Sequence, residues 1–210
     1  VFCEEKVSLM IERMISNKLK GSFNTKVYSF GNFLRCNKPM DNLLTKEGSA
    51  MVVKNILSTA KLNCFKASKE SIAPTLYDLF IQLKSAKITP NDILNAIDNT
   101  NGVLKNKLAD IYTVYSGYED FIAQNRFEDQ SSVLSYLPQV ILQSEYLSGA
   151  SIYIVGFSGF TAQIRSAIDA LCQKNNDITA ILCEGDNPLV FVNETAEYIK
   201  SLAKQNDYPF

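Results

Sequence analysis

The stretch Ser151-Ile152-Tyr153-Ile154-Val155-Gly156 decides the fold class. Its apolar residues are β-branched or aromatic, and Gly149 and Gly156 bound it, which predicts a short buried strand. Residues 161–173 follow with helical periodicity, and residues 178–183 form a second apolar run. A strand, a helix and a second strand in this order predict a parallel sheet and therefore an α/β fold.

The N-terminal end continues the α/β pattern. Residues 1–3 are expected to be the end of a buried strand, and residues 4–19 have the apolar spacing of a helix that stops at Gly21. Residues 27–30 are β-prone and lead into a further helix. Because the chain opens inside a strand without a methionine, we expect a fragment whose sheet is truncated at its N-terminus and has an open edge prone to self-association.

The middle of the chain is different, because its apolar residues recur only at helical spacing. The longest predicted helix covers about residues 103–124. An irregular loop of this length is rare within a compact domain, so a helical insertion is the simplest account. The predicted organisation is an α/β core of residues 1–36 and 149–210 with an all-helical insertion at 37–148.

The composition excludes several functions. The 210 residues include 21 basic and 22 acidic ones, a net charge of -1 that weighs against an autonomous nucleic-acid binder. There is no histidine, which excludes Ser-His-Asp and Cys-His catalysis and zinc sites with histidine ligands. No apolar run is long enough to span a membrane. The scattered cysteines predict reduced thiols in a cytoplasm; they are Cys3, Cys36, Cys64, Cys172 and Cys183.

The sequence lacks the groups that hold a nucleotide and its metal ion. No G-x-x-x-x-G-K-[ST] phosphate loop is present. A magnesium ion needs a carboxylate at the end of the buried strand, but the strand ends in Val155 and Gly156. We therefore expect no catalytic residue, no bound cofactor and no metal in this chain. The turn Glu184-Gly185-Asp186 follows the second strand, and a polar turn is favoured there over a ligand site.

A candidate DNA-binding segment lies near the N-terminus. Ser29 and Asn32 can donate hydrogen bonds to phosphate oxygens, and Arg35 is a cation about one helical turn further on. Tyr28 or Phe30 could stack on a base. The alternative is that the aromatic rings belong to the core and that a polar residue caps a helix.

Several segments, in order, resemble the N-terminal region of AddB-type (RexB-like) subunits of bacterial helicase–nuclease complexes. Phe2-Cys3-Glu4-Glu5 is similar to the family's Val-Pro-(Asp/Glu)-Gln segment. Residues 27–30 resemble its Val-x-Ser-Phe segment, which is similar to a DNA-contacting motif of UvrD-like helicases. Residues 153–163 resemble its Tyr-x-Asp-Gly-Phe-x-x-Phe-Thr-Pro-Gln block. Val155 replaces the family's aspartate and Cys3 its proline.

This resemblance implies a RecA-like half-domain, of the P-loop NTPase class, that supports structure and single-stranded DNA handling in double-strand-break repair and recombination. An AddA-type subunit would be the partner motor and nuclease. The parent complex would use ATP, magnesium and an iron–sulfur cluster held outside this region, and would be an ATP-dependent deoxyribonuclease. Two alternatives stay open: a scaffold that only docks the partner, and a nucleotide-binding domain whose phosphate loop lies upstream of Val1.

Overall fold

The computed structural model describes residues 1–65, 71–129, 131–174, 177–182 and 190–205, without the side chains of 190–192. The described chain forms two units. Unit 1 contains residues 1–39 and 134–210, and unit 2 contains residues 40–133. The insertion predicted at 37–148 extends further toward the C-terminus than unit 2, which ends at residue 133. The reason is that the helix at 137–143 belongs to unit 1, where it packs against the helix at 162–174.

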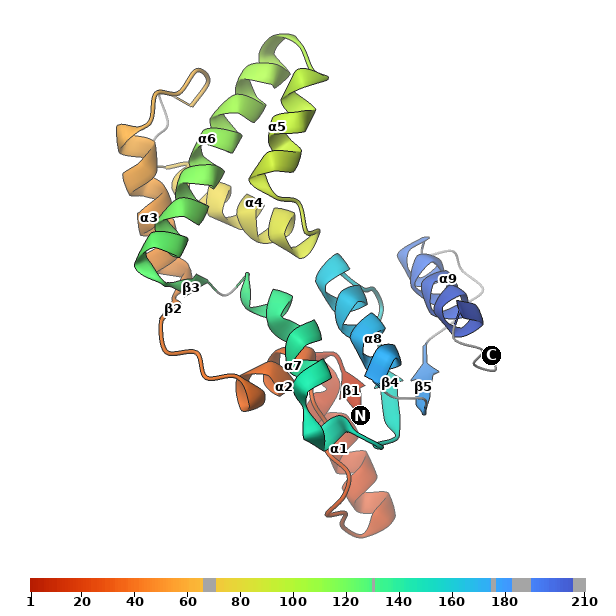
Figure 1. Ribbon diagram of the computed structural model, residues 1–210. Coiled ribbons are helices and arrows are strands. Elements are labelled where there is room, and N and C mark those ends of the chain that lie inside the picture. Colours follow the sequence, from red (N-terminus) through yellow and green to blue (C-terminus); the bar gives the residue numbers. More distant parts are fainter. Residues whose placement is uncertain (66–70, 130, 175–176, 183–189, 206–210) are drawn as a thin grey trace. The chain divides into compact units, whose positions relative to one another are not determined.

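Unit 1 contains a small parallel sheet, as the sequence predicts (Figure 1). Its strands lie in the order β1-β4-β5, and Cys3 is paired with Val155, which is paired with Ile181. Tyr28 forms a parallel bridge to Phe2 on the other side of β1. The bounds are β1 (Phe2–Cys3), α1 (Glu5–Leu19), α2 (Phe30–Asn37), α7 (Leu137–Gln143), η2 (Glu145–Leu147), β4 (Ile152–Val155), α8 (Ala162–Lys174), β5 (Ile178–Ile181) and α9 (Val190–Gln205).

The central strand is buried on only one of its faces. Ile152 and Ile154 are buried, whereas Tyr153, which points to the opposite face, is 43% exposed. The predicted buried strand is therefore confirmed for Ile152 and Ile154, while the face that carries Tyr153 is partly open to solvent. The carboxyl end of β4 turns at Gly156, whose φ of 71° lies in the left-handed region that glycine adopts without a steric penalty.

Unit 2 is mainly helical, in agreement with the periodicity of its sequence. Its helices begin at the expected signals: the Thr45 side chain accepts from the Gly48 N–H, and Thr89 forms a capping box with Asp92. A short parallel pair of strands was not predicted. The bounds are β2 (Leu43–Leu44), α3 (Lys46–Thr59), α4 (Ala73–Ser85), α5 (Pro90–Asp98), α6 (Gly102–Asn125) and β3 (Glu128–Asp129), and η1 (Val133–Tyr136) joins the two units.

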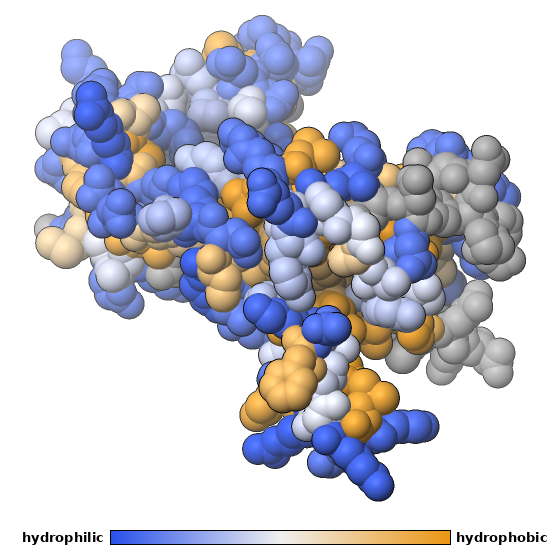
Figure 2. All heavy atoms as spheres, turned by 60° about the horizontal axis from the view of Figure 1, so that its bottom comes forward, coloured by the Kyte–Doolittle hydropathy of each residue, from blue (hydrophilic) through white to orange (hydrophobic). Residues whose placement is uncertain are grey.

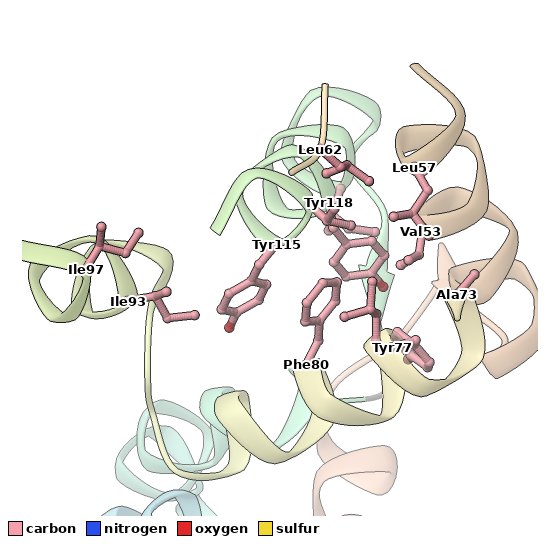
Figure 3. Close-up of a cluster of buried hydrophobic side chains, with 13 residues drawn as sticks. Val53, Leu57, Leu62, Ala73, Tyr77, Phe80, Ile93, Ile97, Tyr115 and Tyr118 are labelled. Atoms are coloured by element: carbon pink, nitrogen blue, oxygen red, sulfur yellow. The ribbon is translucent and has the colours of Figure 1, made fainter. Parts of the chain in front are cut away.

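The core of unit 2 is built around stacked aromatic rings from α4 and α6 (Figure 3). The rings of Phe80 and Tyr115 are stacked with centroids 4.7 Å apart, and Tyr77 meets Tyr118 edge to face at 5.9 Å. These arrangements add to the free energy gained from burying the rings. Tyr115 and Tyr118 are both buried, so these tyrosines of the long helix pack in the core.

Candidate nucleic-acid interface

Three helices of unit 1 begin at the same edge of the parallel sheet. Because the strands run in one direction, the residues after β1, Tyr28 and β4 all leave the sheet at its carboxyl edge. Helices α1, α2 and α8 start there, at Glu5, Phe30 and Ala162. Their N-terminal N–H groups favour negative charge at this edge, which is where ligands of parallel α/β folds usually bind.

Backbone hydrogen bonds hold the candidate DNA-binding segment against β1. The Tyr28 N–H donates to the Val1 carbonyl at 2.8 Å, and the Cys3 N–H donates to the Tyr28 carbonyl at 3.0 Å. Ser29 is the N-cap of α2, and its side-chain oxygen accepts from the Asn32 N–H at 3.1 Å. Ser29 is buried, and its side-chain oxygen already serves as the N-cap of α2. This oxygen therefore takes part in a hydrogen bond inside the protein.

The aromatic residues of the segment belong to the core of unit 1. Phe30 is 3% exposed, and its ring is stacked on Phe2 with centroids 4.8 Å apart. Phe33 is fully buried and meets the half-buried Tyr28 ring edge to face at 5.6 Å. Phe30 offers no exposed face to a base. For this residue the structure favours the packing alternative that the sequence left open.

Asn32 and Arg35 are the exposed members of the segment, whereas Tyr28 is half-buried. They are three residues apart on α2, so their side chains lie on neighbouring turns of one helix face. Arg35 Nη2 donates to Glu5 Oε1 at 3.1 Å, and both side chains are exposed. An exposed ion pair contributes at most about 1 kcal/mol, so a phosphate group can replace the carboxylate at little cost.

A carboxylate lies at this edge that the sequence analysis missed. Glu4 Oε1 accepts hydrogen bonds from the Ser158 N–H at 3.0 Å and the Ser158 hydroxyl at 2.8 Å, and Lys6 Nζ lies 2.6 Å from Glu4 Oε2. The Lys6 hydrogen bond, followed by the Ser158 N–H, lowers the pKa of Glu4 below its ordinary value. The register of the two adjacent parallel strands places the residue after Cys3 beside the turn after Val155, and no local sequence pattern gives this register.

The described residues form no group of three or more histidine, cysteine, aspartate or glutamate side chains that could hold a metal ion. At the end of β4, Glu4 is held by a lysine and two donors from Ser158, which is an arrangement that fixes a turn. The predicted polar turn Glu184-Gly185-Asp186 lies outside the described residues. None of the helices in the described part of the chain is both long enough and apolar enough to cross a membrane.

Comparison with known proteins gives one consistent match. The family model described as "ADDB, N-terminal" matches residues 5–204. A Clostridium tetani protein, named as a subunit of an ATP-dependent helicase/deoxyribonuclease, is 30% identical over 185 residues, which are 80% of this chain and 16% of that protein. A protein of the same name from Alkaliphilus oremlandii is 28% identical over 221 residues, which cover 96% of this chain and 19% of that protein. Another from Listeria welshimeri is 26% identical over 189 residues, which cover 85% of this chain and 16% of that protein. This chain spans less than a fifth of the length of these relatives.

Proposed function

Since this chain belongs to the family of AddB N-terminal regions, we propose that it is the helicase-like region of a DNA-repair helicase–nuclease subunit. In this proposal the region contacts single-stranded DNA and supports a partner motor subunit of the AddA type. It performs no nucleotide hydrolysis of its own. The names of the relatives, which describe a subunit that acts on DNA with ATP, support the class of the proposal.

The fold of unit 1 supports a RecA-like arrangement. Its sheet is entirely parallel in the described residues, and α8 is the crossover between the adjacent strands β4 and β5. Strand–helix–strand units of this kind place ligand-contacting residues at the carboxyl edge of the sheet. The segment with Asn32 and Arg35 begins at this edge.

The observation that carries the DNA contact is the exposure of Asn32, in the first turn of α2, and of Arg35, in its last turn, whose guanidinium reaches Glu5 at the first turn of α1. A phosphate between them would meet an amide donor, a guanidinium and the helix N-termini that favour negative charge at this edge. Among the described residues, the ion-pair partner of this guanidinium is Glu5, and that pair is exposed. Phosphate contacts position a strand without reading its bases.

The end of β4 supports the absence of hydrolysis. Val155 and Gly156 stand where a motor protein has a carboxylate for magnesium. The nearby Glu4 carboxylate is engaged by Lys6 and Ser158. If the Glu4 side chain turned to bind a metal ion, it would lose both hydrogen bonds from Ser158 and its ion pair with Lys6.

Fluorescence anisotropy of a labelled thymidine dodecamer, titrated with the 210-residue chain, tests the DNA contact. We expect Arg35→Ala to weaken binding by about tenfold, since a charge-assisted contact contributes about 1.5 kcal/mol. The slope of log affinity against log salt should fall by about 0.7, the value for one phosphate on a single strand. Lys107→Ala, which removes an exposed cation from α6, is the matched control. Equal affinities and slopes for both variants and the unchanged chain would refute the contact.

A further inference from the structure

The end of α1 and the loop after it form a defined projection of unit 1. Helix α1 ends at Lys20, whose φ of 52° is left-handed, and the Gly21 N–H donates to the Ser16 carbonyl at 3.0 Å. The Ser22 hydroxyl donates to the Thr25 side-chain oxygen at 2.9 Å. The loop then returns to the sheet, where the amino group of Val1 donates to the Lys26 carbonyl at 2.8 Å. These bonds fix both ends of the loop and its turn.

This projection has an unusual charge for the chain that carries it. From residue 13 to residue 40 there are six basic residues and no acidic one, although the whole chain has 21 basic and 22 acidic residues. Four of the six lie on the projection, and none of Arg13, Lys18 and Lys20 forms an ion pair with another residue of the described chain. A cluster of one sign on a nearly neutral protein indicates a polyanionic ligand.

An aromatic ring lies at the tip of the same projection. Phe23 is 101% exposed, so its ring packs against none of the described side chains. Met14 and Leu19 on the adjoining turns of α1 are 63% and 57% exposed. Figure 2 shows hydrophobic and hydrophilic side chains side by side on this part of unit 1. An exposed aromatic ring between lysines is the combination by which proteins hold unpaired bases and their phosphates.

We propose that the projection, formed by Arg13, Lys18, Lys20, Phe23 and Lys26 and here called the basic tip, is a second contact for single-stranded nucleic acid. Phe23 stacks on a base, and the cations hold the flanking phosphates. The proposal rests on the proposed function, because it extends the strand that Arg35 contacts. A duplex would satisfy the cations but not the ring, since its base faces are already stacked.

Helix α1 connects the two contacts. Arg35 is paired with Glu5 at the first turn of α1, and the basic tip follows the last turn. The 15 residues of α1 measure about 22 Å at 1.5 Å per residue. A stacked single strand advances about 3.4 Å per nucleotide, so about six nucleotides cover this distance. Lys6 and Arg13 are seven residues apart and lie along one side of the helix, toward which the strand would run.

The absence of tryptophan from the chain gives a direct test. Phe23→Trp places a single tryptophan on the tip, and its exposed site tolerates the larger ring. We expect a saturable quenching of its fluorescence by a thymidine dodecamer, as stacking on a base requires. Lack of quenching at concentrations where anisotropy reports full binding would overturn the proposal.

Affinity measurements separate the two contacts. Phe23→Ala should weaken dodecamer binding by about fivefold or more with an unchanged salt slope. The double variant Lys18→Ala, Lys20→Ala should lower the slope by about 1.4, or 0.7 for each phosphate. A thymidine tetramer is too short to reach both sites, so its binding to the Arg35 site should not change in these variants.

Each result has one interpretation. If Arg35→Ala weakens binding but both tip variants bind the dodecamer like the unchanged chain, the basic tip is refuted and the proposed function stands. If the tip variants weaken binding and Arg35→Ala does not, the Arg35 contact is refuted. Competition by a polyglutamate peptide as strong as that of the dodecamer, dependent on the tip, would refute the nucleic-acid assignment in favour of an acidic protein partner. Circular dichroism melts of every variant control for folding.

Discussion

Replacing Asp129 in the core of unit 2 should cause a large loss of stability. Asp129 is 0% exposed, and its two oxygens accept from Lys84 Nζ at 2.8 Å, from the Tyr118 hydroxyl at 2.9 Å, and from the N–H groups of Ser131 and Ser132 at 2.7 and 2.8 Å. The Ser131 hydroxyl also donates to Asp129, and Lys84 is buried too, so the variant Asp129→Ala would leave a cation and four donors without their acceptor. Removing one partner of a buried ion pair costs about 3–5 kcal/mol.

The loss of stability caused by Asp129→Ala should lie at the lower end of this range. Glu119 Oε1 lies 2.5 Å from Lys84 Nζ and keeps part of the compensating charge. We expect Asp129→Ala to lose about 3 kcal/mol, which corresponds to a fall in Tm of about 6–12 °C for a chain of this size. Urea unfolding followed by circular dichroism measures the free energy, and differential scanning calorimetry measures the Tm. A loss below about 1 kcal/mol would refute the account of the buried pair.

A double variant and a pH series test the cause. If the stranded charge is responsible, Asp129→Ala combined with Lys84→Met should be less destabilised than the sum of the single variants. Burial would raise the pKa of Asp129, but the charge and hydrogen bond of Lys84 outweigh it and lower the pKa below the ordinary value. The contribution of the carboxylate is therefore present above the unfolded-state pKa of about 3.9 and is lost as pH falls through the lower folded-state pKa. The stability gap between the unchanged chain and Asp129→Asn should close below about pH 4.

Three further predictions concern single hydrogen-bonding groups. Ser29→Ala removes the N-cap of α2 and should cost about 1 kcal/mol in urea unfolding, whereas Ser29→Asp, which keeps a capping oxygen, should cost less; equal losses would refute the capping role. Asp110→Ala removes the acceptor of the N–H groups of Asn63, Cys64 and Phe65 and should cost about 2–3 kcal/mol, with faster hydrogen exchange at these three amides; unchanged exchange would count against it. Glu4→Ala should cost about 1–2 kcal/mol through the lost Ser158 bonds, while Glu4→Gln, which keeps an acceptor oxygen, should retain most of that stability; a Gln variant as unstable as the Ala variant would show that the ion pair with Lys6 dominates.

Local signals in the sequence were sufficient for the helices. Thr89 before Pro90 and Asp92 is a local signal for a capping box, and α5 begins at this point with that box formed. The parallel strand order around residues 151–183 also followed from periodicity, and the sheet formed by β4 and β5 confirms it. Leu104 has the apolar spacing of the buried side of the long helix but is 55% exposed. An apolar spacing identifies a helix face and does not say where along the helix the neighbouring elements end.

The sequence could not give contacts between distant residues. The β2–β3 pair joins Leu43 to Glu128 through only two residues in each strand, which is too short for a periodic pattern. Glu4 meets Ser158 because two strands pair in a particular register, and neither segment alone contains that information. Phe23 is missed for a related reason: no pattern separates an exposed ring from a buried one, and only the geometry of the loop after α1 shows it.

The order of the two units along the chain has a consequence for how the polypeptide folds as it leaves the ribosome. Unit 2 is one uninterrupted stretch that ends at residue 133, whereas the sheet of unit 1 pairs residue 2 with residue 154. At a synthesis rate of about 5–20 residues per second, about 8–30 s pass between the synthesis of β1 and that of its neighbour β4. The aromatic helices are complete before that moment. The nascent chain should therefore mature from its middle outward, with its first two-residue strand among the last parts to find its place.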